Sequence, residues 1–329
     1  MKHTLWILLV LCFLLSACVA ESQPAAEQTA PETAVVTIPE ETVFVTEEET
    51  TEETIPPVEG VDGETLYNED QFALVFQDLT VAQLPENATR KEKAAFKEGW
   101  DMTMAAVNRT DITVYMRLMN LSVNSYMFEN LPTVVLEPGE YREIHYTLTN
   151  EELEFNAITE IQDLQFNLWV YDSEDFKTPD VADGLCKCYV NRKEPTYPQR
   201  EPQETDQILV ENERYNVTVT QVTVGDDVTV QLHLQNYSDK ELIFVAPYAL
   251  VNEKVTDPLW ACNVSGGKQR NAVLTFTAQQ LKDAEIEDIQ SIVLPIQIGD
   301  HNDWSLGAYF YEKFEIKLPV EPTEPEITE

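Results

Sequence analysis

The feature that most constrains the fold is a strand-like pattern that occurs twice in the chain. Residues 111–122 align with residues 227–238 at an offset of 116, and both segments alternate apolar and polar residues before an Asn-x-Ser triplet. A period of two is typical of a strand that buries one face. Residues 147–175 then align with residues 275–303 at an offset of 128. The chain is therefore predicted to contain two copies of one β-rich unit, with an insertion in the second copy around residues 252–267.

Short helices are predicted between some of the strands. Thr89, Thr149 and Thr277 each precede Glu or Gln by three positions, which is the capping-box pattern of a helix start. Thr149 and Thr277 are equivalent in the two copies, whereas Thr89 belongs to an insertion found only in the first. The strands are too close together for the crossover helices of a parallel sheet. We therefore expect an all-β fold of two tandem Ig-like β-sandwiches, each with one short helix.

The first residues have the layout of an export signal. Lys2 precedes an apolar run at residues 5–15, which is shorter than the roughly 20 residues that span a bilayer, and Ser16 and Ala17 precede Cys18. The Leu-Ser-Ala-Cys quartet resembles the lipobox of bacterial lipoproteins. This resemblance implies cleavage before Cys18, a diacylglycerol on its sulfur, and attachment to the outer face of the cell membrane. The alternative is an ordinary secretory signal in which Cys18 is incidental.

Composition divides the chain into six segments. Residues 21–63 contain 12 acidic residues and no basic residue, which is typical of a disordered tether, and three prolines within residues 193–204 indicate a stiff linker. The expected segments are a lipoprotein signal peptide (1–17), a lipidated acidic tether (18–63), a first sandwich (64–192), a linker (193–204), a second sandwich (205–318) and an acidic disordered tail (319–329).

The two β-rich units together resemble the tandem Ig-like regions of Gram-positive surface lipoproteins. The resemblance rests on the alternating strand that ends in Asn-x-Ser and on the capped helix that precedes Ile-x-x-Ile or Ile-x-x-Leu, and it covers most of residues 64–318. The paired cysteines around a central Trp of antibody-type domains are absent. The resemblance implies a surface-exposed protein.

Charge and cysteine content limit the possible partners. The formal net charge of −38 repels nucleic acid and anionic lipid, so neither is an expected partner. Cys186 and Cys188 point to the same face of a predicted strand, and Cys262 belongs to the other copy. We expect all three to be buried or half-buried free thiols, because no second pair of Cys or His accompanies them as a zinc site requires.

Two acidic turns at equivalent positions are candidate calcium sites. Asp172 and Asp175 of the first copy correspond to Asp300 and Asp303 of the second. Clustered carboxylates in a loop can ligate calcium, but aspartate is also a common turn residue. A plain turn is therefore the alternative at both places.

The insertion in the first copy is a candidate partner-binding element. Arg90, Lys91, Lys93 and Lys97 lie within eight positions of an otherwise acidic chain. Such a helix could dock an acidic partner or a phosphate-bearing wall polymer. The alternative is a solvated helix with Phe96 packed inward.

No pattern of catalytic residues accompanies these features. Ser265 and Lys268 match the Ser-x-x-Lys spacing of penicillin-recognising enzymes, but the two glycines between them predict a turn rather than a helix start. We expect no enzyme and no cofactor. The leading interpretation is a membrane-anchored binding or spacer protein outside a bacterial membrane, attached through Cys18 and contacting an unidentified macromolecule. The alternatives are a glycan- or wall-polymer-binding module, with Trp100, Trp260 and Trp304 as possible platforms, and a solute-binding lipoprotein.

Overall fold

The structure is a computed structural model that describes residues 55–172, 176, 178–190, 195–197, 200–258, 260–303 and 307–319. Cys18, the signal, the tether up to residue 54 and the tail from residue 320 lie outside these residues, as do Asp175 and Trp304. All the described residues belong to one compact unit, Glu53–Glu329. Within them, no helix has the length and apolar character needed to cross a membrane.

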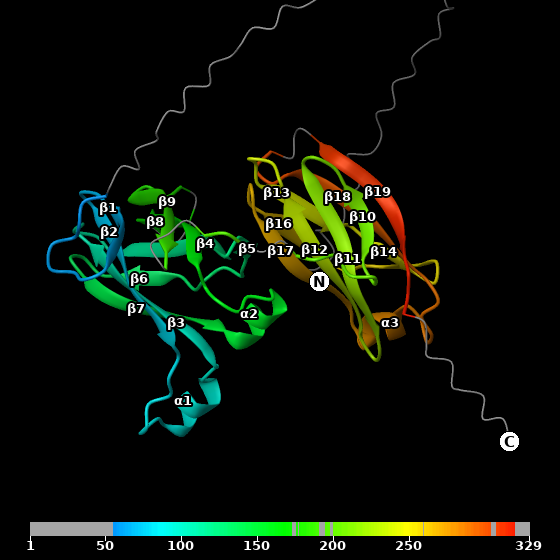
Figure 1. The fold of residues 1–329 in the computed structure, drawn as a ribbon, viewed down its shortest axis with the longest axis horizontal. Helices are drawn as coiled ribbons and strands as arrows, with labels where there is room; N and C mark the ends of the chain where they lie inside the picture. The colour runs from blue at the N-terminus through cyan, green and yellow to red at the C-terminus, as the bar shows by residue number, and fades with distance from the viewer. Residues whose placement is uncertain are drawn as a thin grey trace, which may run out of the picture. The chain divides into compact units, whose positions relative to one another are not determined.

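The first part of the chain forms a β-sandwich that carries two short helices (Figure 1). Its strands are β1 (Glu64–Asn68), β2 (Phe72–Val81), β3 (Gly99–Asn108), β4 (Val114–Val123), β5 (Tyr126–Met127), β6 (Val134–Leu136), β7 (Tyr141–Thr149), β8 (Asp163–Tyr171) and β9 (Ala182–Tyr189), and its helices are α1 (Arg90–Ala95) and α2 (Asn150–Phe155). One sheet has the order β1-β2-β3-β7, and the facing sheet contains β4, β5, β6, β8 and β9.

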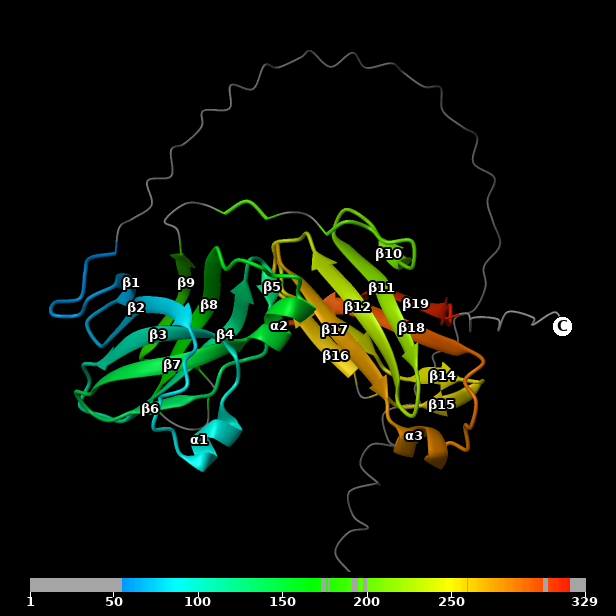
Figure 2. The ribbon, with the colours of Figure 1, turned by 60° about the horizontal axis from the view of Figure 1, so that its bottom comes forward.

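The second part of the chain forms a second sandwich with one helix, which Figure 2 shows at the end where β17 finishes. Its elements are β10 (Gln207–Glu211), β11 (Tyr215–Val224), β12 (Val228–Asn236), β13 (Leu242–Ala246), β14 (Ala249–Val251), β15 (Lys254–Thr256), β16 (Trp260–Val264), β17 (Gln269–Phe276), α3 (Ala278–Asp283), β18 (Ile292–Asp300) and β19 (Ala308–Ile316). The strands β10, β11, β12 and β17 face a sheet of β13, β14, β15, β16, β18 and β19. The predicted tandem, Ig-like, all-β architecture is confirmed.

All three predicted capping boxes are present. Thr89, Thr149 and Thr277 each accept a hydrogen bond from the backbone N–H three residues later, and the Glu or Gln at that position bonds back to the threonine N–H. The first sandwich therefore carries the predicted helix of its insertion, α1, in addition to α2, which corresponds to α3 of the second sandwich.

The two sandwiches repeat one pairing pattern at a single offset. Tyr115 of β4 lies opposite Tyr171 of β8, and Ile243 of β13 lies opposite Gly299 of β18, so both partners differ by 128 positions. The other strand pairs from β3 onward follow the same offset, including β3–β7 with β12–β17 and β4–β6 with β13–β16.

The predicted alignment of residues 111–122 with residues 227–238 is therefore wrong. The first segment leads into β4, whereas the second contains β12, which corresponds to β3. The insertion lies in the first copy, where residues 82–98 separate β2 from β3, and not around residues 252–267 of the second copy. Alternation of apolar and polar residues marks any half-buried strand, so it does not identify which strand of the fold is present.

A buried asparagine marks the equivalent turn in each copy. The side-chain Nδ2 of Asn236 donates to the carbonyls of Lys240 (2.6 Å) and Val264 (2.8 Å), and its Oδ1 accepts from the N–H (3.0 Å) and the hydroxyl (2.7 Å) of Ser238. Asn108 makes the corresponding bonds in the first copy. The Asn-x-Ser/Thr triplets at these two positions are thus turns closed by the asparagine side chain.

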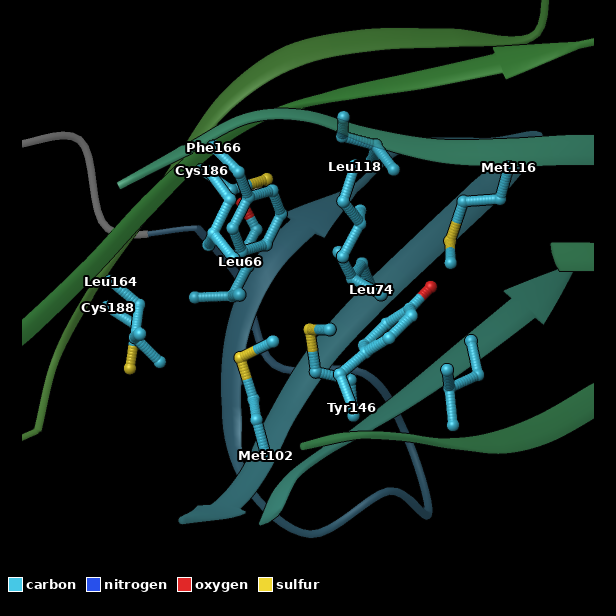
Figure 3. Close-up of a cluster of buried hydrophobic side chains, with 14 of the residues drawn as sticks. Leu66, Leu74, Met102, Met116, Leu118, Tyr146, Leu164, Phe166, Cys186 and Cys188 are labelled. Carbon is cyan, nitrogen blue, oxygen red and sulfur yellow. The ribbon is translucent and has the colours of Figure 1, made fainter. Parts of the chain in front are cut away.

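Each sandwich encloses its own apolar core. In the first sandwich, side chains from both sheets meet between them, as Figure 3 shows for Leu74 and Met102 on one side and Leu118 and Phe166 on the other. All four are at most 1% exposed. Burying such side chains contributes about 1.5–3 kcal/mol each, which makes these cores the main source of stability.

The last residues of the predicted tether pack against the first sandwich. Val58 is buried and contacts Ala73, Val75 and Ala105 on the outer face of the β1-β2-β3-β7 sheet. The small side chains on this face leave room for the covering segment. The ordered part of the chain therefore begins before residue 64.

One sheet runs through both sandwiches. β5 of the first pairs in parallel with β17 of the second, with Tyr126 opposite Gln269, to give a nine-stranded sheet. Met127, which follows Tyr126 in β5, is 3% exposed and packs in the core of the second sandwich. The sequence predicted only a linker between the units, so this direct junction is a new finding.

Hydrogen bonds reinforce the junction beside Met127. Their donors belong to Lys268, which precedes β17, and to the first three residues of β17, and their acceptors belong to the first sandwich. The bonds are Lys268 Nζ to Gln165 Oε1 (2.6 Å), Gln269 N to Ser125 O (3.0 Å), Asn271 Nδ2 to Phe155 O (2.9 Å) and an ion pair of Arg270 with Glu129.

We predict that Met127→Ala destabilises the second sandwich by about 2–5 kcal/mol, because it leaves a cavity in that core. Urea unfolding of the full chain would measure the change. Val255, the equivalent residue at the 128 offset, is 71% exposed, so Val255→Ala serves as the control and is expected to change stability by about 0.5 kcal/mol or less. Equal effects of the two substitutions would contradict the packing of Met127 across the junction.

Candidate functional site

A cleft of about 570 Å³ lies where the two sandwiches and the segment between them meet. Its lining combines carboxamide side chains with aromatic rings and few charges. The residues are Asn124, Tyr126, Phe155, Asn156, Ala157, Ile158, Thr159, Glu160, Gln162, Tyr197, Arg200, Glu201, Gln203, Thr220, Gln221, Gln231, Leu232 and Asn271. A volume between about 300 and 1,000 Å³ is typical of sites for small molecules.

The strands that line the cleft are adjacent in the nine-stranded sheet. Gln221 lies on β11, Gln231 on β12, Asn271 on β17 and Tyr126 on β5, and the sheet order is β11-β12-β17-β5. β12 pairs with β11 and β17 along both edges, whereas β10 covers β11 only at residues 216–219 and β5 meets β17 only at Gln269. Recognition at β12 must therefore come from side chains.

The wall contributed by the first sandwich is fixed by Asn124. Its Oδ1 accepts from the backbone N–H of Gln162 (2.8 Å) and its Nδ2 donates to the carbonyl of Glu160 (2.6 Å). The chain leaves α2 through Ala157, which has a φ of 53°. Asn252 makes the equivalent bonds in the second copy, so this loop shape is part of the duplicated fold.

His233 connects the two sandwiches beside the cleft. It is 3% exposed, and its Nδ1 lies 2.8 Å from Oδ1 of Asn271, whose Nδ2 donates to the carbonyl of Phe155. The Tyr126 ring lies 6.1 Å from the His233 ring, centroid to centroid. Among the described residues, no hydrogen-bond partner reaches Nε2 of His233. Burial lowers the pKa of His233 below its usual range, which keeps the ring neutral near pH 7.

The one arginine of the lining is already paired. Nη1 and Nη2 of Arg200 each donate to one oxygen of Asp206 at 2.7 Å, and Gln203 N donates to the same carboxylate at 2.9 Å. The bonds from Arg200 hold the pKa of Asp206 below its usual range, and they raise that of Arg200. Since Glu160 and Glu201 also line the cleft, the site has no excess of positive charge.

The four basic residues of the insertion lie elsewhere. Arg90, Lys91 and Lys93 lie on α1, Lys97 follows it, and all four are exposed. α1 buries none of its residues, and Phe96 is half-buried. The four basic residues of the insertion line no part of the cleft. The hypothesis of an acidic partner at α1 stays a prediction.

Among the described residues, the carboxylates of the two acidic turns are not brought together into a common site. The carboxylate of Asp300 accepts from Lys240 Nζ (3.1 Å) and the hydroxyl of Tyr309 (3.1 Å), and the bond from Lys240 lowers the pKa of Asp300. Calcium at this turn would have to displace the ammonium group of Lys240. Asp172 lies exposed at the end of β8, and Asp303 follows β18. In the described part of the chain, no three His, Cys, Asp or Glu side chains gather as a metal site.

The cysteines are buried thiols, as predicted. Cys186, Cys188 and Cys262 are free and buried. Burial raises the pKa of Cys186 to about 12 and that of Cys262 to about 11, so both remain protonated at neutral pH. A protonated thiol is a poor nucleophile and a poor metal ligand.

The segment that matches Ser-x-x-Lys is a turn, as predicted. The N–H of Lys268 donates to the carbonyl of Ser265 at 3.1 Å, and Gly267 has a φ of 67°. Trp100 and Trp260 are half-buried and do not line the cleft.

The sequence did not reveal the residues that form the cleft. Gln231 and His233 alternate with buried residues in β12, which marks them as outward-facing, but nothing in the sequence indicates that the first sandwich covers that face. Gln162 follows a predicted helix without any motif.

No family model and no curated protein matches this sequence. Among solved structures, the chain is similar to a crystal structure of red sea bream transglutaminase, with a TM-score of 0.19 and 10% sequence identity over 69% of this chain. The matched region spans 29% of that protein, so the likeness covers less than a third of its length.

We predict that His233 makes stability depend on pH. Because its pKa is lower in the folded than in the unfolded state, the unfolded chain takes up the proton first, and stability falls as pH drops below about 6.5. One proton limits this contribution to about 1.4 kcal/mol per pH unit. The groups facing His233 are Asn271, Tyr126, Arg200 and Asp206.

Urea unfolding between pH 5 and 8 would test this prediction. His233→Gln is expected to flatten the pH profile relative to the wild type. Parallel profiles for the wild type and His233→Gln would show that the buried ring does not titrate on unfolding.

Proposed function

We propose that this chain is a lipid-anchored, non-enzymatic binding protein on the outer face of a bacterial cell membrane. The observation that carries the proposal is the cleft formed jointly by both sandwiches and the segment between them. Carboxamides and aromatic rings dominate its lining, and these groups bind ligands but do not exchange protons near pH 7. The arginine of the lining, Arg200, is bonded to Asp206, and the histidine beside the cleft, His233, is bonded to Asn271.

The lipid anchor is supported by the sequence around Cys18. An acylated Cys18 would be separated from Ile55, the first described residue, by a segment that reaches at most roughly 130 Å when fully extended. Such a length allows the sandwiches to work at a distance from the bilayer, whether they bind a ligand or act as a spacer.

The anchor is tested by Cys18→Ser in cells that produce the full chain. We expect the wild type in the membrane fraction with a lipid mass on its first residue, because two acyl chains give stable attachment. The variant is expected to lack the lipid mass. Cys12→Ser, within the apolar run, is the control and should retain the anchor. A wild-type chain without lipid, measured by mass spectrometry, would refute this part of the proposal.

Binding at the cleft is tested by photocrosslinking on intact cells. We expect p-benzoyl-phenylalanine at Phe155, whose side chain is 38% exposed in the cleft lining, to give a discrete crosslinked adduct. The same probe at Asp283, the equivalent position of the second copy, is the control because it lies outside the cleft. Gel mobility and mass spectrometry would detect the adduct. Identical products at the two positions, or none, would favour the spacer role instead.

A further inference from the structure

We infer that the cleft binds a neutral oligosaccharide. The inference rests on the proposed function, since it names the class of ligand for the same site. It follows from the hydrogen-bonding groups, apolar surfaces, charge balance and strand arrangement of the cleft.

The unpaired polar groups of the cleft suit hydroxyl groups. In the described part of the chain, the carboxamides of Gln162 and Gln231 and the hydroxyl of Tyr126 line the cleft without a hydrogen-bond partner of their own. A carboxamide offers one acceptor oxygen and two N–H donors in one plane. A sugar hydroxyl both donates and accepts, so neighbouring hydroxyls of one ring can satisfy both halves of a carboxamide.

The apolar part of the lining suits the flat faces of sugar rings. Phe155, Tyr126 and Ile158 contribute to the same cleft as the two glutamines. Aromatic rings bury a large apolar surface at a small cost in conformational entropy. A pyranose presents C–H groups on its faces and hydroxyls around its edge, which matches rings and carboxamides placed side by side.

The charges of the cleft favour a neutral ligand. The bidentate bond to Asp206 compensates Arg200, and Glu160 and Glu201 add negative charge to the lining. A phosphate, sulfate or uronate would therefore find no uncompensated cation among the described lining residues and would be repelled by Glu201.

The central strand of the cleft cannot add a peptide strand. Peptides that add to a sheet need a strand edge with unpaired backbone groups. β12, which carries Gln231, pairs with β11 along one edge and with β17 along the other, so it offers no such edge. At this strand a ligand is recognised by side chains, and sugar hydroxyls suit their carboxamides.

The test is titration calorimetry of the full chain, purified in detergent, with chitotriose, cellotriose, maltotriose and mannotriose as neutral probes. Trigalacturonic acid and an N-acetylated, C-amidated pentaalanine are the anionic and peptide probes. We expect at least one neutral trisaccharide to bind. Gln162→Ala and Gln231→Ala should each raise its Kd about tenfold, because each removes hydrogen bonds worth about 1.4 kcal/mol.

The duplicated fold supplies a matched control for these variants. Gln290 is the equivalent of Gln162 in the second copy and lies exposed, away from the cleft. Gln290→Ala should therefore bind the trisaccharide as the wild type does. Thermal unfolding of each variant would establish that the sandwiches remain folded.

Several results would overturn the inference. These are no binding of any neutral trisaccharide, binding unchanged in both Gln162→Ala and Gln231→Ala, or tighter binding of the uronate or the peptide. If the probes fail while Phe155 still crosslinks to a discrete partner on cells, the ligand class is wrong and the binding function stands. If both experiments fail, the proposed function falls as well.

Discussion

The insertion of Met127 into the core of the second sandwich is the contact on which the junction of the two sandwiches and the candidate site depend. It brings β5 alongside β17. It also places the four residues from Lys268 to Asn271 within hydrogen-bonding reach of the first sandwich. An apolar side chain supplies the burial energy, and directional hydrogen bonds around it set the register. Without this contact the cleft would lose one of its walls, since its lining comes from both copies. The candidate site is thus a property of the pair and of neither sandwich alone.

The duplication separates the features that both copies need for the fold from the features that belong to one copy alone. Asn108 and Asn236, and likewise Asn124 and Asn252, make the same bonds in both copies, so they serve the fold. Features present in one copy only stand out against this background. Met127 is buried where its equivalent Val255 is exposed, and the first copy alone carries α1. An internal repeat therefore provides a comparison within one chain.

Local signals predicted much of the fold, whereas long-range contacts were not predictable. The capping boxes at Thr149 and Thr277 and the alternation in the strands are encoded within a few residues, and both were confirmed. The register between the copies was misassigned, because alternation looks alike in β4 and β12. The cleft escaped prediction for a further reason. Gln162 and Gln231 come to line the same cleft only through the junction centred on Met127. No sequence pattern indicates that a methionine of the first sandwich will pack in the core of the second.

The pairing of β5 with the start of β17 has a consequence for aggregation. A strand at the edge of a sheet presents unpaired backbone groups, which can recruit a strand from a neighbouring molecule. Tandem copies of one fold are especially exposed to such mispairing, because each copy resembles the natural partner of the other. Here β5, only two residues long, occupies the edge of β17 at Gln269 inside the same chain. The junction therefore closes the start of β17 to a strand from a neighbouring molecule.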